Sequence, residues 1–152
     1  MKFVADCMLG KLAKWLRLIG CDTEYIHDAE DSDLIRIAIQ QDRILLTRDC
    51  ELANRKILNG RALLIEDDRT SQQLIMVMQA FGLRINMFTR CAVCNGEIVK
   101  ADKNSVREFV PPYVFSTQDS FGRCLVCGRI YWRGTHIDNV IKQLEAILPQ
   151  ST

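Results

Sequence analysis

The chain has 152 residues, of which 48% are apolar and 26% are charged, and its formal net charge is +1. These values are typical of a soluble globular protein, and the length fits one ordinary domain or a domain with a small metal-binding module. No apolar run is long enough to span a bilayer and the N-terminus has no signal-peptide pattern, so we expect a cytoplasmic protein without a membrane partner.

Strands and helices alternate through the first half of the chain. Apolar residues recur at helical spacing in the helices, while the strands are short apolar runs between turn residues. This alternation predicts a parallel α/β sheet with helices on its faces. The expected order is strand 2–6, helix 8–19, strand 23–26, helix 31–41, strand 43–47, short helix 51–58, strand 62–65 and helix 70–81.

Several residues are expected to begin or end these helices. Asp31 or Ser32 is predicted to cap the second helix, and Thr70 with Gln73 matches a capping box before the fourth. Gly82 is placed to close that fourth helix.

The pattern changes near residue 84, where we expect a second unit. A polar stretch (100–108), a Pro-Pro break (111–112), an aromatic strand (130–132) and an amphipathic helix (137–148) follow. We therefore predict one domain over residues 1–83 and a second unit over residues 84–152.

Two Cys-x-x-Cys pairs define that second unit: Cys91 with Cys94, and Cys124 with Cys127. Each pair aims two thiolates at one point, and four thiolates are a tetrahedral ligand set for structural Zn²⁺. The gap between the pairs is longer than usual, so an insertion must loop out between them. We predict a zinc ribbon and regard a thiol redox role as the weaker interpretation, because two matched pairs favour a closed metal site.

Acidic residues gather where the predicted strands end. In an open parallel sheet, ligands bind beyond the carboxyl ends of the strands, and carboxylates that meet there repel one another unless a cation is present. Oxygen ligands of this kind suit Mg²⁺ or Mn²⁺. The candidates are Asp6, Asp31, Asp33, Asp49, Asp67 and Asp68.

Each acid also has a purely structural interpretation. Asp31 and Asp33 fit the role of helix caps, an interpretation that we favour for Asp31, and Asp67 and Asp68 fit that of solvated loop acids. An acid directly after an apolar core strand has no evident structural task. A functional role is therefore favoured for Asp6 and for the acid at position 49.

Basic residues suggest a phosphate-bearing partner. Residues 84–133 carry 8 Lys/Arg against 4 Asp/Glu, whereas residues 1–83 carry 11 against 13. Lys11, Lys14 and Arg17 recur every three residues along the first helix, close to Asp6, and Arg48 lies beside the acid at position 49. These side chains are candidates for holding a nucleic-acid backbone, and a solvated outer face is the alternative.

Four blocks of residues stand in the same order as in a known family. They are FVADCMLGKLAKWLR (3–17), LLTRD (45–49), and the two cysteine knuckles RCAVCNG (90–96) and CLVCGRIYWRGTH (124–136). The combination resembles the Mut-seven C-terminal RNase domains. The resemblance implies a PIN-like nuclease fold with a zinc ribbon, in which Asp6, Asp33 and Asp49 hold Mg²⁺ or Mn²⁺ and Asp67 or Asp68 is the fourth acid.

We therefore expect a metal-dependent ribonuclease with a structural zinc ion and RNA as its partner. Two other functions stay open. The chain could bind RNA without cleaving it, or the ribbon could dock a protein partner such as the ribosome.

Overall fold

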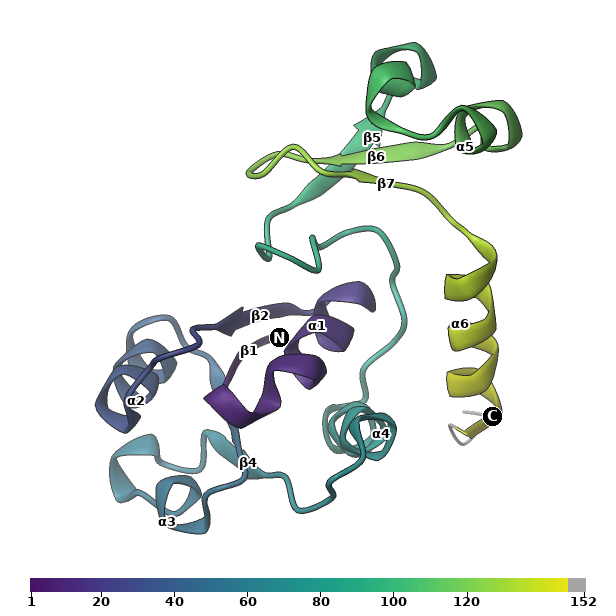
Figure 1. The fold of residues 1–152 in the computed structure, drawn as a ribbon. Helices are drawn as coiled ribbons and strands as arrows, with labels where there is room; N and C mark the ends of the chain where they lie inside the picture. The colour runs from purple at the N-terminus through teal and green to yellow at the C-terminus, as the bar shows by residue number, and fades with distance from the viewer. Residues whose placement is uncertain (148–152) are drawn as a thin grey trace.

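The computed structural model describes residues 1–147, apart from the side chains of Thr135, His136 and Ile147. Figure 1 shows a sheet with helices on both sides, a second and smaller sheet beyond it, and a last helix that runs back toward the first sheet. The predicted combination of a parallel sheet with helices, a four-cysteine ribbon and a final helix is confirmed.

The first sheet has four parallel strands in the order β2-β1-β3-β4. Its central strands β1 and β3 are almost wholly buried, which explains why they read as continuous apolar runs. The strands are β1 (Lys2–Ala5), β2 (Asp22–Tyr25), β3 (Ile44–Thr47) and β4 (Ala62–Leu64).

Helices cover the two faces of this sheet. Successive strand residues point to opposite faces, so Phe3 and Leu46 join one apolar cluster while Val4 and Leu45 join the other. The first cluster packs against α1 (Gly10–Leu18) and α4 (Thr70–Phe81). The second packs against α2 (Asp31–Gln40), α3 (Cys50–Ala53) and the 3₁₀ helix η2 (Lys56–Leu58), while a further 3₁₀ helix, η1 (Cys7–Leu9), links β1 to α1.

The structure corrects two predicted caps. The cap residue of α2 is Glu30, which forms a capping box with Asp33, so neither Asp31 nor Ser32 is the cap. The cap residue of α4 is Arg69 and not Thr70, and its side chain makes no capping hydrogen bond. Gln73 does not complete a capping box, since its side-chain amide donates to the Asp67 carbonyl (2.7 Å). The prediction for Gly82 is confirmed, since this residue ends α4 with a φ of +60°.

The second sheet is antiparallel, with the strands β5 (Ile98–Ala101), β6 (Phe121–Cys124) and β7 (Ile130–Tyr131) in that order. The long insertion between the cysteine pairs folds into the 3₁₀ helix η3 (Lys103–Phe109) and α5 (Pro112–Thr117). Val106, Val110 and Phe121 form a small apolar cluster beneath it. The insertion is therefore structured.

The last helix, α6 (Thr135–Ile147), packs against the first sheet's helices. Its residues Val140 and Leu144 belong to the apolar cluster that also contains Leu12 of α1 and Leu74 of α4. The final helix thus shares its core with residues 1–83, although it follows the ribbon in sequence, and the domain bounds stay a prediction. Leu148, expected at the end of this helix, lies outside the described residues.

Within residues 1–147 no helix combines the length and apolar character needed to span a membrane.

Candidate functional site

The strand order creates a switch point between β1 and β3. The chain leaves β1 toward β2 on one side, and it leaves β3 toward β4 on the other. The connections diverge between these two strands, and open α/β sheets bind ligands at the crevice that this divergence creates. Asp6 directly follows β1 and Asp49 lies two residues beyond β3, so both predicted acids stand at this crevice.

Asp6 is a buried carboxylate, with 7% of its surface exposed. Its amide donates to the Leu46 carbonyl (3.0 Å), which continues the pairing of β1 with β3. One carboxylate oxygen accepts from the Met8 amide (2.9 Å) and the other from the Thr47 hydroxyl (2.7 Å). The orientation of the carboxylate is therefore fixed by both the following turn and the neighbouring strand.

Thr47 connects the two acids. Its hydroxyl is wholly buried, donates to Asp6 and accepts a hydrogen bond from the Asp49 amide (3.0 Å). Sequence reasoning assigned no role to Thr47. The one local signal is its place in the chain, because a hydroxyl that ends an apolar strand two residues before Asp49 needs a polar partner.

Asp49 has a structural task that the sequence did not reveal. One of its carboxylate oxygens accepts from the amides of Glu51 (2.9 Å) and Leu52 (3.2 Å), so Asp49 caps α3. Asp6 likewise caps η1 through the Met8 amide, so the expectation that these two acids lack a structural task is wrong for both. The other oxygen of Asp49 has no hydrogen bond within the described part of the chain, and the residue is exposed.

Asp33 lies on α2 and is engaged within that helix. Its side chain accepts from the Glu30 amide (3.2 Å) and from Arg36 (3.2 Å). These two hydrogen bonds hold the pKa of Asp33 below its usual range.

Asp67 and Asp68 are likewise paired with arginines. Asp67 accepts from the Arg69 side chain (3.0 Å), which lowers the pKa of Asp67, and Asp68 forms an ion pair with Arg48. Arg48 also donates to the Glu66 carbonyl (3.3 Å).

The structure does not gather the predicted acids into one cluster. In residues 1–147 only the four cysteines bring three or more ligand atoms within 4.8 Å of one another.

The four cysteines meet as predicted. Sγ of Cys91 is 3.6 Å from that of Cys127, and Sγ of Cys94 is 3.4 Å from that of Cys124. These separations are far too long for disulfides, whose sulfurs are about 2.05 Å apart. They are close to the spacing of about 3.8 Å between the corners of a tetrahedron with Zn–S bonds of 2.3 Å. The donor set therefore fits a structural zinc ion.

Two neighbours shape the cysteine cluster. The Tyr131 hydroxyl lies 2.8 Å from Sγ of Cys91 and accepts from the Ala92 amide (3.2 Å). Burial opposes ionisation of Cys91, but hydrogen bonds from Tyr131 and nearby backbone amides bring the pKa of that thiol down to about 6. A Cβ at Gly96 would approach Sγ of Cys124 to 2.8 Å, so only glycine fits there. Tyr131 and Gly96 therefore favour a compact thiolate site.

The sequence predicts that Arg17 contacts a nucleic acid. In the structure, Arg17 instead lies in the interface between the parallel sheet and the ribbon. It is buried, with 7% exposure, because its guanidinium donates to the carbonyls of Thr23 (2.8 Å), Ala92 (3.3 Å) and Val93 (3.1 Å). The expected stripe of three exposed cations is therefore wrong at Arg17. Lys11 and Lys14 remain exposed on α1.

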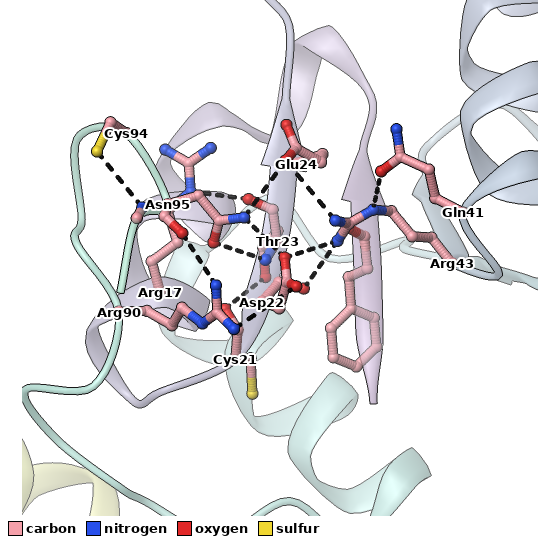
Figure 2. A network of polar contacts seen from close by, with 12 residues as sticks. Arg17, Cys21, Asp22, Thr23, Glu24, Gln41, Arg43, Arg90, Cys94 and Asn95 are labelled. Atoms are coloured by element: carbon pink, nitrogen blue, oxygen red, sulfur yellow. Dashed lines mark hydrogen bonds and ion pairs between the residues drawn. The ribbon is translucent and has the colours of Figure 1, made fainter. Parts of the chain in front are cut away.

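Asn95 completes the attachment of the ribbon to the sheet. Figure 2 shows Asn95 of the first knuckle among the side chains of β2. Its side-chain oxygen accepts from the Thr23 amide (3.0 Å) and its amide donates to Asp22 (2.7 Å), which also pairs with the buried Arg43 (2.8 Å). Burial opposes ionisation of Asp22, but the bonds from Arg43 and Asn95 lower its pKa. The first cysteine knuckle thus covers the open edge of β2.

The Mut7-C RNAse domain family matches residues 1–144, which include the switch-point acids and all four cysteines. The chain belongs to this family. The human protein named "Exonuclease mut-7 homolog" is 27% identical to this Mut7-C domain over 117 residues. That match covers 72% of the chain but only 13% of the human protein, so the chain corresponds to a small part of it. No solved structure shows a significant match to this Mut7-C domain.

Proposed function

We propose that this Mut7-C domain is a metal-dependent ribonuclease whose reaction takes place at the crevice between β1 and β3. Asp6 and Asp49 differ from three of the other predicted acids in their pairing. Asp33, Asp67 and Asp68 are each paired with an arginine, whereas no lysine or arginine within residues 1–147 pairs with Asp6 or Asp49. These two carboxylates have no internal counter-ion, which favours a bound cation beside them.

Mg²⁺ and Mn²⁺ suit this arrangement. Such ions are commonly held by one or two carboxylates, with water and substrate phosphate filling the remaining positions. Asp6 and Asp49 would provide the carboxylates, and Asp33 would join them only after leaving Arg36. When bound, the ion would supply an activated water and positive charge for the phosphodiester. Asp67 and Asp68 would assist from the neighbouring loop.

RNA is the proposed substrate. Exposed Lys11 and Lys14 lie on α1, which follows Asp6 in the chain, and would hold the phosphate backbone. Arg48 would contribute once it is released from Asp68. The name of the human relative, an exonuclease homologue, supports a nuclease activity. We place the domain in the cytoplasm because its proposed zinc site needs four reduced thiols.

The decisive experiment compares Asp6→Asn with Asp42→Asn in an RNA cleavage assay with Mn²⁺. Asp42 is an exposed acid that precedes β3, so it lies at the N-terminal end of that strand, opposite the end that leads to Asp49. Its substitution therefore controls for the loss of one carboxylate. We expect Asp6→Asn to lower the cleavage rate by about a hundredfold or more, and Asp42→Asn to leave it within about twofold. Unchanged cleavage by a folded Asp6→Asn protein would contradict the proposed site.

A second candidate is an RNA-binding protein without turnover. The observation that favours it is the engagement of Asp33, Asp67 and Asp68 with arginines, which leaves two acids at the crevice. It predicts RNA binding at every Mg²⁺ or Mn²⁺ concentration and no cleavage in the wild-type protein.

Protein docking through the ribbon is the third candidate. The knuckles expose Val93 (55%), Leu125 (63%) and Val126 (73%), which would suit an apolar partner surface. This function predicts weak RNA affinity with little salt dependence, whereas phosphate contacts make affinity fall steeply with salt.

A further inference from the structure

The ribbon carries a groove of about 410 Å³ that none of the roles above uses. It lies against the antiparallel sheet. Its lining comes from the linker before the first knuckle, from all three strands, from the residues between α5 and β6, and from the residues after β7. We call it the ribbon groove. Its side chains include Phe88, Lys100, Gln118, Tyr131, Trp132 and Arg133.

The chemistry of the ribbon groove combines aromatic rings with positive charge. Phe88, Tyr131 and Trp132 are each half-buried, so part of each ring remains accessible. Lys100 and Arg133 are exposed at the groove, and no carboxylate of the described residues lines it. Arg133 is paired with Asp138, whereas Lys100 has no ion pair within residues 1–147.

The groove is also rigidly built on one side. The Tyr131 hydroxyl is held by Sγ of Cys91 and the Ala92 amide, so this ring is positioned by the zinc knuckle itself. Trp132 packs against the apolar cluster that lies under the insertion. Rings that are fixed before a ligand arrives lose little entropy on binding, which favours stacking.

We propose that the ribbon groove binds an unpaired base of single-stranded RNA, by stacking on its aromatic rings and by contact of Lys100 with the adjoining phosphate. Stacking is open to every base, but bases inside a duplex are already stacked and their faces are hidden. The excess of positive charge in residues 84–133, 8 Lys/Arg against 4 Asp/Glu, complements the RNA backbone. The role of the groove in selecting a substrate rests on the proposed ribonuclease function.

The position of the groove connects it to the switch-point crevice along α1. The Asn86 amide donates to the Ile19 carbonyl (2.8 Å), which holds the linker at the C-terminal end of that helix. Met87 lines a second cleft of about 430 Å³, together with Lys11, Lys14 and Trp15. Asp6 lies before the N-terminal end of α1, and a helix of nine residues is about 14 Å long. A strand bound in the ribbon groove would therefore run beside Lys14 and Lys11 toward Asp6.

The test measures RNA binding without Mg²⁺ or Mn²⁺, so that its result does not depend on cleavage. The probe is a fluorescein-labelled oligouridine of about 12 nucleotides, a length within the range of known single-strand sites, and its duplex with oligoadenosine is the comparison. We expect the single strand to bind at least about tenfold more tightly than the duplex. Equal affinity for the two probes would overturn the proposal.

Lys100→Ala is compared with Lys142→Ala, which removes an exposed lysine of α6 outside the groove. We expect Lys100→Ala to weaken single-strand binding several-fold and to reduce the slope of affinity against salt by about 0.7, while Lys142→Ala changes neither. Both substitutions are on the surface, so both proteins should fold. The same affinity and slope in the two variants would contradict the assignment of Lys100.

Trp132 provides a direct signal for stacking. In a Trp15→Phe background it is the only tryptophan, and we expect the single strand to quench its fluorescence. Trp132→Ala should lower affinity by about tenfold, and Trp132→Phe should retain most of it. No quenching by a bound strand would overturn the groove assignment. If these binding results hold and the wild-type protein does not cleave, the ribonuclease proposal fails and the groove stands.

Discussion

At the scale of single residues, the candidate site depends on one hydroxyl. Thr47 donates to Asp6 (2.7 Å) and accepts from the Asp49 amide (3.0 Å), so one buried group sets the spacing of the two acids. Threonine suits this task because a hydroxyl can donate and accept at once, which neither valine nor alanine can do. Thr47 is therefore a positioning residue, because it acts through the acids that it holds.

Thr47→Val is expected to slow RNA cleavage about tenfold or more, because the Asp6 carboxylate loses a bond that orients it. The Mn²⁺ concentration needed for half-maximal rate should rise as well, and Thr47→Ser should restore both values. A steady-state assay over a Mn²⁺ titration measures them, with thermal unfolding as the check on the fold. Wild-type values in Thr47→Val would show that the hydroxyl has only a structural role.

At the scale of elements, the first cysteine knuckle covers an edge strand. Asn95 adopts a left-handed backbone with φ +66° and turns its side chain toward β2, where it accepts from the Thr23 amide. Asparagine tolerates this backbone better than most residues and carries both a donor and an acceptor. The knuckle therefore depends on Asn95 for its turn and for its attachment.

Asn95→Ala is expected to lower the free energy of unfolding by about 2 kcal/mol, because the Thr23 amide loses its buried acceptor. Asn95→Gly loses the same hydrogen bonds but accepts the left-handed backbone, so it should be less destabilised by about 1 kcal/mol. Urea unfolding measures these values, and zinc content is determined for each variant.

Asn104→Ala is the matched control for these two variants, since Asn104 is exposed on η3. Its free energy of unfolding should stay within about 0.5 kcal/mol of wild type. The same stability in Asn95→Ala and Asn104→Ala would show that the attachment to β2 contributes nothing.

At the scale of the whole molecule, the two sheets are coupled. Arg17 of α1 donates to the carbonyls of Ala92 and Val93, and Asn95 binds β2, so the four-cysteine site and the parallel sheet share buried polar contacts. Zinc sites of this kind contribute folding free energy to the unit that contains them. In this protein the consequence of zinc loss should extend beyond the ribbon.

Removal of zinc by a chelator is expected to speed hydrogen exchange of the Thr23 amide by about tenfold or more, because its acceptor Asn95 is released with the knuckle. The Asp6 amide, which donates to Leu46 between two central strands, should exchange as slowly as before. Hydrogen-exchange NMR on the zinc-bound and zinc-free proteins compares the two amides. Unchanged exchange at Thr23 would show that the sheets are independent.

The sequence by itself determined the order of the elements and the four-cysteine site. Both are written in local patterns, namely the alternation of apolar strands with amphipathic helices and two Cys-x-x-Cys pairs. The parallel sheet and the cysteine cluster are confirmed for that reason. Strand ends are local features too, and for this reason the sequence predicts that Asp6 and Asp49 lie at the same end of the parallel strands.

Only the tertiary structure decided which polar groups are free. The sequence places Arg17 in an exposed stripe of cations. In the structure, Arg17 is buried because it donates to carbonyls of the first knuckle, which is 75 residues away in the chain. Thr47 and Asp6 are 41 residues apart, and Leu144 joins the apolar cluster that contains Leu12 only because α6 returns to the first sheet. The physical reason is that hydrogen bonds and packing between distant segments depend on the tertiary arrangement of the elements. Local hydrophobic periodicity indicates the elements but not how they pack against one another.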